Sequence, residues 1–303
     1  MHEQTEFMKK IRSQLPLLIA PALIAVSLGW TSSALSAETP ARIVSVGGAL
    51  TEIVYALDGP ANLIGVDTTS LWPEAAKALP QVGYMRNLSA EGILSLAPTL
   101  LIASAHAGPP AVIEQIRAAG VQVETLSEDY SEQGVINKIT GIATLLGKQA
   151  DGNRLTAQVR DDFSRLAQWR SQLSAHPKVM FFMAVSHGAP LVSGRDTAAD
   201  AMIGLVGADN AVDFQGNKPM GGEAIIAAAP EVIALTEITL NAVGGLESFY
   251  QLPGIAHTPA GKHRRVIVMD TLNLLGFGLR SGRTALDFAK QLQHPADVAA
   301  DQR

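Results

Sequence analysis

Tyr84 has the side chain with the most distinctive chemistry in this sequence. It follows Gly83, a residue type that permits unusual backbone geometry. A phenolate is a hard anionic ligand that suits ferric iron, and tyrosine is known as a proximal ligand of haem iron. Arg86 is two residues further along, so in an extended loop it would project from the same side as Tyr84. A free phenol titrates near ~10, and a neighbouring cation would help to hold its anion.

Chemistry alone does not establish such a ligand. The pattern is short, and a tyrosine on a surface loop with no bound partner explains it more simply. The other three tyrosines do not suggest a ligand either. Tyr55 lies on the apolar pattern of a helix, Tyr130 lies near a helix start, and Tyr250 lies in a loop before Pro253.

His187 is a second candidate for ligand contact. It lies in the segment Val185–Gly194, directly after a strand that opens the second half of the chain. Loops at the carboxyl ends of strands face ligand crevices in open α/β sheets, so His187 would meet a ligand from the side opposite Tyr84. A loop histidine that bonds only to its neighbours is an equal alternative. His106 follows a strand and can face the same crevice, but a structural role is favoured there.

Strand and helix patterns alternate from Arg42 onward, which is typical of parallel α/β sheets. The strand-like runs are 43–46, 63–66, 100–103, 121–125 and 179–185, and the helical runs include 50–57, 111–119 and 284–292. Residues 150–174 interrupt this alternation, because apolar residues recur there at spacings of three and four with charges between them. This spacing predicts one long amphipathic helix that ends near His176-Pro177.

The two halves contain a weak repeat. Glu91–Ala103 aligns on Glu223–Leu235 without a gap, with Glu, Ile, Ala and Pro at matching offsets. Each copy predicts a short helix, an Ala-Pro turn and a buried strand. The same turn is a common connection by chance, but the two copies lie on either side of the long helix. We therefore expect an α/β fold of two Rossmann-like lobes, 38–149 and 176–303, joined by the helix 150–175, with a ligand cleft between the lobes.

Glu91 and Glu223 occupy the same place in the two copies of the repeat. Each lies near a helix start, where a carboxylate interacts favourably with the helix dipole, and this alone accounts for either residue. Their symmetric placement also suggests two acidic docking points, one per lobe, for two equivalent basic pockets on a dimeric partner.

The first 37 residues resemble a signal peptide. Three basic residues precede an uncharged, mostly apolar run, Leu15–Leu28, and small and polar residues follow it. That run is shorter than the ~20 residues of a membrane-spanning helix, so cleavage is favoured over a permanent anchor. The cut is predicted after Ala37 or after Ser36. The protein is therefore expected in the periplasm.

Composition excludes several functional classes. The 303 residues include 47% hydrophobic and 17% charged residues, which is not the composition of a disordered chain. There is no cysteine, so disulfides, zinc-thiolate sites and thiol nucleophiles are excluded. A formal net charge of −5 makes nucleic-acid binding a poor interpretation.

Signatures of enzymes are largely missing. There is no Gly-x-Ser-x-Gly elbow, Walker loop or His-Glu-x-x-His motif, and Gly276–Gly282 has the wrong spacing for a dinucleotide fingerprint. An exported hydrolase acting through Ser186 and His187 is the enzymatic alternative, but no acidic partner or oxyanion signature accompanies these residues. We therefore expect a binding protein and not an enzyme.

The chain resembles the haem-binding periplasmic proteins of bacterial haem ABC importers over most of residues 40–300. Two of the segments that carry the resemblance are shared with the wider class that transports cobalamin and ferric siderophores, namely Arg42–Leu57 and Ser89–Pro98. The Gly-Tyr-x-Arg motif of Val82–Arg86 and the segment Thr197–Met202 are more particular to the haem branch, and Leu252–Gly261 extends the match.

The resemblance implies a role for each candidate residue. Tyr84 corresponds to the axial ligand of a b-type ferric haem, and Arg86 to an arginine that contacts the phenolate or a propionate. His187 falls where some members have a histidine that ligates or faces haem. Glu91 and Glu223 correspond to two glutamates that dock onto permease arginines, although Gly221-Gly222 stands where a bulkier pair is expected.

The resemblance also implies the partners. They are haem, an inner-membrane ABC permease with its ATPase, and an outer-membrane haem receptor system as the donor. Cobalamin or a ferric siderophore carried by the same fold is the alternative cargo. A siderophore pocket is expected to be richer in arginine and aromatic residues, and this chain has only 5% aromatic residues.

Overall fold

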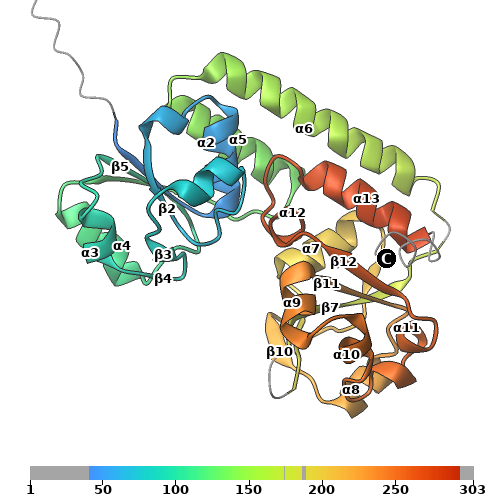
Figure 1. Ribbon diagram of the computed structural model, residues 1–303. Helices are drawn as coiled ribbons and strands as arrows, with labels where there is room; N and C mark the ends of the chain where they lie inside the picture. The colour runs from blue at the N-terminus through green and yellow to red at the C-terminus, as the bar shows by residue number, and fades with distance from the viewer. Residues whose placement is uncertain (1–40, 174, 186–188, 294–303) are drawn as a thin grey trace, which may run out of the picture. The chain divides into compact units, whose positions relative to one another are not determined.

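A computed structural model describes residues 41–173, 175–185 and 189–293 (Figure 1). The predicted signal peptide and the predicted ligand-contact residue His187 lie outside the described residues, as does Ser186. None of the helices in the described ranges has the length and apolar character that crossing a membrane requires.

Four parallel strands make the first sheet, in the order β2-β1-β5-β6. The two central strands, β1 and β5, are buried along their whole length, as expected for a parallel sheet covered by helices, whereas the edge strand β6 is only partly buried. The strands are β1 (Ile43–Val46), β2 (Leu63–Val66), β5 (Leu100–Ser104) and β6 (Gln122–Leu126), and the helices of this half are α2 (Gly48–Ala56), α3 (Ala90–Leu94), α4 (Pro110–Ala118) and α5 (Glu132–Leu145). The predicted strands and helices of this half are confirmed.

The second sheet is mixed and has the order β10-β8-β7-β11-β12, with a short strand β9 beside β7. β7, β11 and β12 are parallel to one another. At one side of the sheet β8 pairs with β7 in the antiparallel direction, and β10 pairs with β8 in the antiparallel direction. The strands are β7 (Lys178–Ala184), β8 (Leu191–Ser193), β9 (Asp209–Asn210), β10 (Asn217–Pro219), β11 (Val232–Thr236) and β12 (Val266–Met269). The helices are α7 (Ala198–Leu205), α8 (Gly222–Ala228), α9 (Glu237–Val243), α10 (Leu246–Tyr250), α11 (Pro259–Lys262) and α12 (Thr271–Leu275).

One long helix, α6 (Gln149–Arg170), connects the two sheets along the chain and packs on α5 and on the C-terminal helix α13 (Ser281–Gln293) (Figure 1). Gly282 permits the close approach of α13, because a Cβ there would lie 3.0 Å from the Phe163 nitrogen of α6. The helix ends earlier than predicted. After Arg170 the chain tightens into i→i+3 hydrogen bonds, of which Leu173 N to Arg170 O is 3.0 Å long.

The repeat found in the sequence is also a repeat in structure. In both copies the alanine of the Ala-Pro turn that follows the short helix has a positive φ, 46° at Ala97 and 48° at Ala229. In both copies the isoleucine two residues after the glutamate, Ile93 or Ile225, is fully buried. Equivalent backbone turns therefore feed equivalent central strands, β5 and β11.

Glycine at position 222 has a local packing reason. A Cβ at Gly222 would lie 2.9 Å from the carbonyl carbon of Pro253, so a larger residue would displace that loop. The opposing Gly254 has a φ of 89°, which also favours glycine. The glycine at position 222 thus reflects close contact between α8 and the Pro253-Gly254 turn, whereas a Cβ at Gly221 would meet no atom within 4 Å and nothing in the structure explains that glycine.

A buried ion pair links α2 to the start of α13. Glu52 lies 2.6 Å from the Arg280 guanidinium, and Arg280 also stacks on the Trp72 ring. Burial raises the pKa of Glu52 above its ordinary value of 4.5, although Arg280 opposes the shift. This carboxyl therefore binds its proton more tightly in the folded state, and its stabilising contribution is lost as pH rises through the folded pKa.

Replacing Glu52 by glutamine should consequently cost less stability at about pH 7 than at about pH 4, because glutamine carries no charge to desolvate. Urea unfolding of both proteins at the two pH values measures this difference. If Glu52→Gln lowers the free energy of unfolding more at the higher pH, the attraction of Glu52 to Arg280 outweighs the cost of burying its charge.

Candidate ligand-binding site

A cavity of about 590 Å³ lies at the carboxyl ends of the strands. From the first sheet, its lining includes a residue that follows each of the four strands in turn: Gly47 after β1, Thr68 after β2, His106 after β5 and Glu128 after β6. Ligands bind at this edge of open α/β sheets, and the volume lies within the ~300–1,000 Å³ of typical ligand sites.

The second half of the chain lines the same cavity. Met183 is the penultimate residue of β7, Ile238 follows β11, and Thr271 begins α12, separated from the end of β12 by one residue. The first turn of α7 contributes Thr197, whose hydroxyl caps the helix by accepting a hydrogen bond from the Asp200 nitrogen at 3.1 Å. The cavity is thus formed by loops from both sheets, as the predicted ligand cleft requires.

A buried carboxylate fixes the loop at the base of the cavity. Asp67 is fully buried, and its Oδ1 accepts hydrogen bonds from the Gly47 nitrogen and the Ser70 hydroxyl, both at 2.9 Å. Its Oδ2 accepts from the nitrogen and hydroxyl of Thr69, and that hydroxyl oxygen in turn accepts from the Gly48 nitrogen at 3.0 Å. The start of α2 is held in place by these bonds, which gives the cavity a preorganised wall.

Tyr84 lines the cavity, and so does Arg86. Tyr84 ends strand β3 (Gly83–Tyr84), which pairs with β4 (Asn87–Leu88) as an antiparallel hairpin. Arg86 therefore lies in the two-residue turn of that hairpin and not in the extended loop that the sequence suggested. The exposed fraction of Tyr84 is 49%, and the described residues form no hydrogen bond with its hydroxyl.

Two residues that the sequence analysis assigned to structural roles also line the cavity. Tyr130 follows β6, and His106 follows β5. The Tyr130 hydroxyl lies 3.5 Å from His106 Nδ1. The sequence signal for both positions is that each follows a predicted strand. Adjacent parallel strands bring both residues to the same edge of the sheet, where they line the cavity.

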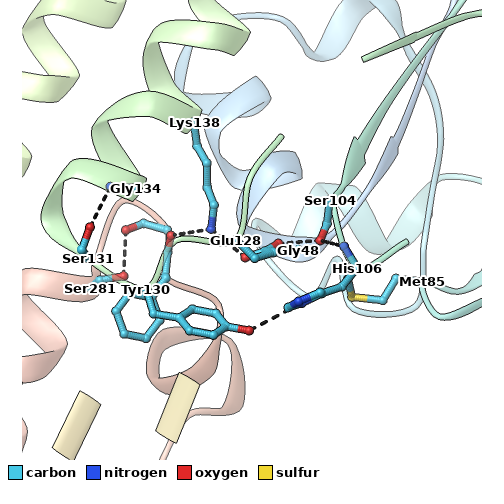
Figure 2. A network of polar contacts seen from close by, with 12 residues as sticks. Gly48, Met85, Ser104, His106, Glu128, Tyr130, Ser131, Gly134, Lys138 and Ser281 are labelled. Carbon is cyan, nitrogen blue, oxygen red and sulfur yellow. Dashed lines mark hydrogen bonds and ion pairs between the residues drawn. The ribbon is translucent and has the colours of Figure 1, made fainter. Parts of the chain in front are cut away.

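A largely buried ion pair lies next to His106 and Tyr130, and its Glu128 also lines the cavity (Figure 2). Lys138 of α5 is only 1% exposed and lies 2.9 Å from the Glu128 carboxylate. The other Glu128 oxygen accepts a hydrogen bond from the Ser104 hydroxyl at 2.5 Å. Lys138 also donates to the Phe277 carbonyl at 3.3 Å, so this pair connects the first half of the chain to the segment before α13.

The cavity presents an unusual amount of exposed apolar surface. Tyr84, Met183 and Ile238 line it and are among the large hydrophobic residues that are most exposed in the described ranges. Exposed apolar patches of this kind mark binding surfaces. In the described residues, no group of three or more His, Asp or Glu side chains is placed to hold a metal ion. The arrangement suits a ligand with a large apolar face and a few polar groups.

The predicted docking residues Glu91 and Glu223 lie away from this cavity lining. Each is the second residue of its short helix, α3 or α8, and each is exposed. Their equivalent positions in the structural repeat agree with the symmetry noted in the sequence.

Residues 43–271 match the periplasmic binding protein family. Two similar solved structures are the periplasmic heme-binding protein BhuT in complex with two hemes and the periplasmic heme-binding protein RhuT from Roseiflexus sp. RS-1 in apo form. BhuT is 41% identical with a TM-score of 0.80, and RhuT is 40% identical with a TM-score of 0.79. Each match covers 83% of this chain and 97% of the other.

Curated relatives are more distant. An uncharacterized ABC transporter substrate-binding lipoprotein, YvrC of Bacillus subtilis, is 28% identical over 77% of this chain and 74% of its own. A vitamin B12-binding protein of Photorhabdus laumondii is 24% identical over 65% of this chain and 71% of its own. Together with the family match over most of its length, these similarities establish that the chain belongs to the periplasmic binding protein family, as a substrate-binding protein and not an enzyme.

Proposed function

We propose that this protein captures haem in its cavity outside the cytoplasm and delivers it to an ABC permease. The observation that carries the proposal is Tyr84, a half-exposed phenol that lines the cavity at the end of a hairpin strand. Similarity to BhuT and RhuT, two heme-binding proteins by name, supports haem as the ligand.

Tyr84 is proposed as the axial ligand of b-type haem iron in the ferric state. Its phenolate is a hard donor that favours ferric iron. Arg86, in the adjacent hairpin turn, is proposed to contact either the phenolate or a carboxylate of the porphyrin. His187 remains a predicted contact, as it lies outside the described residues.

The alternative cargo is cobalamin, which the vitamin B12-binding relatives favour. A competition titration separates the two. The purified chain without residues 1–37 should bind ferric haem at one saturable site and give the absorption spectrum of a tyrosine-ligated haem. Excess cobalamin or a ferric siderophore should not displace it. Binding of cobalamin without binding of haem would contradict the proposal.

The partner is an ABC permease with its ATPase, as membership of this transport family implies. Further proposals are that the signal peptide is cleaved in the periplasm and that an outer-membrane receptor system supplies the haem. Glu91 and Glu223 are proposed to dock onto paired basic pockets of the permease, because they occupy equivalent exposed positions on α3 and α8.

The double variant Glu91→Ala/Glu223→Ala should keep the haem affinity of the wild type but lose haem transport into cells or vesicles that contain the permease. Exposed charges that pair with a partner mainly affect docking. Glu114→Ala/Glu247→Ala is the matched control, since it also removes one exposed glutamate from each half. Normal transport by the Glu91/Glu223 variant, or weakened haem binding, would contradict the docking role.

A further inference from the structure

His106 and Tyr130 form a polar pair on one wall of the cavity (Figure 2). The Tyr130 hydroxyl and His106 Nδ1 are 3.5 Å apart, and the rings are inclined at 49°. His106 is exposed, so its other ring nitrogen, Nε2, remains available to a ligand. When Tyr130 donates to Nδ1, the proton of a neutral imidazole is on Nε2.

Neighbouring side chains hold His106 and Tyr130 in place. The Ser104 hydroxyl oxygen accepts a hydrogen bond from the His106 backbone nitrogen at 3.0 Å and donates to Glu128. The Tyr130 ring packs on Phe277 with 5.1 Å between ring centroids. Glu128 is neutralised by Lys138, and both of its oxygens are already hydrogen-bonded. The carboxylate behind the pair therefore has its charge balanced before a ligand arrives.

Arg86 lies close to the same wall. The hairpin turn that carries it is joined to the loop after β5 by two backbone hydrogen bonds, Gly108 N to Met85 O at 2.9 Å and Leu88 N to Gly108 O at 2.8 Å. Burial and the Glu128 charge raise the pKa of Tyr130, while the Arg86 charge opposes this shift. The neutral phenol is therefore favoured at Tyr130, and its hydroxyl keeps a proton to donate in a hydrogen bond.

We infer that His106, Tyr130 and Arg86 form a carboxylate-binding subsite that takes the carboxylate edge of a porphyrin. The inference rests on the proposed function. The His106 Nε2–H donates to one carboxylate oxygen, and the guanidinium of Arg86 adds a charge-assisted donor. Protonation of the imidazole lets Nδ1 donate to the Tyr130 oxygen, which frees the phenolic proton for the ligand as well.

Among the described residues that line the cavity, Arg86 and His106 carry the basic side chains, and both lie at or beside this wall. Asp196 lines the cavity from the second half of the chain with a negative charge, and its Oδ2 accepts a hydrogen bond from Gln215 at 3.0 Å. Asp129 is exposed on the loop that carries Tyr130. A ligand carboxylate is therefore directed to the wall of His106 and Tyr130, while Met183 and Ile238 offer apolar contacts for the rest of the porphyrin.

Metal-free protoporphyrin IX and its dimethyl ester test the inference, because they separate carboxylate recognition from iron ligation. His106→Ala should weaken binding of the free acid by about tenfold, as expected for a lost hydrogen bond to a charged group. Tyr130→Phe should also weaken it, because it removes the hydroxyl that pairs with His106. Both variants should leave binding of the ester unchanged. Porphyrin fluorescence reports both affinities. Tyr130→Phe keeps the ring on Phe277, so its thermal unfolding should match the wild type.

Tyr84→Phe is the matched control, since it should weaken binding of ferric haem but not of metal-free protoporphyrin IX. Equal losses for the acid and the ester in His106→Ala and Tyr130→Phe, or no loss in either, would overturn the subsite. If the subsite is overturned in this way but the wild-type protein binds haem, the proposed function is unaffected. A wild-type protein that binds neither haem nor porphyrin would overturn both.

Discussion

Replacing Tyr84 by phenylalanine should lower the affinity for ferric haem by at least about tenfold, equivalent to ~1.4 kcal/mol, and should abolish the spectrum of a tyrosine-ligated haem. The substitution removes only the oxygen proposed to bind iron. The ring is half exposed and its hydroxyl forms no hydrogen bond with the described residues, so the folded protein loses little else. Equilibrium titration followed by absorption spectroscopy measures both effects.

Tyr55→Phe provides the control for this change. Tyr55 is partly buried on α2, packs on the main hydrophobic core and is not part of the cavity lining, so the same loss of a hydroxyl should leave haem binding unaltered. Haem binding by Tyr84→Phe with unchanged affinity and spectrum would show that another residue holds the iron.

The largest effect on stability is expected for Lys138→Met. Lys138 is 1% exposed, and its ammonium is the ion-pair partner of Glu128, which is 14% exposed. Removing one member of a buried pair leaves an uncompensated charge and typically costs ~3–5 kcal/mol. Methionine has a similar length, so the loss comes from the charge and not from a cavity. Chemical denaturation should show a decrease of about 3 kcal/mol in the free energy of unfolding.

The double variant Lys138→Met/Glu128→Gln identifies the cause of that loss. Removing the Glu128 charge as well should restore part of the stability, because no unpaired carboxylate remains. An unfolding free energy for Lys138→Met equal to that of the wild type would mean that water or another group compensates Glu128 without the lysine.

Much of the fold could be predicted from the sequence, because the patterns that indicate it lie within short segments of the chain. The aligned segments Glu91–Ala103 and Glu223–Leu235 predicted equivalent helix, turn and strand units, and both alanines of the Ala-Pro turns adopt left-handed conformations. The long helix was also predicted, but its end was not. The final turn depends on where i→i+3 bonds replace the helical ladder after Arg170, which the apolar spacing does not specify.

The site was only partly predictable. Tyr84 and Arg86 were identified by residue type and resemblance, whereas their hairpin depends on pairing between β3 and β4 across a two-residue turn. The contact of His106 with Tyr130 depends on the parallel pairing of β5 with β6, which joins residues 24 positions apart in the sequence. The close approach of the Pro253–Gly254 turn likewise explains Gly222 only once α8 has been placed.

A crystal structure of the mature protein with ferric haem tests the central claim most directly. The account predicts haem in the cavity with its iron bound to the Tyr84 hydroxyl oxygen and its carboxylates near His106, Tyr130 and Arg86. Haem bound outside this cavity, or iron held by a different residue while Tyr84 makes no contact with it, would contradict the account.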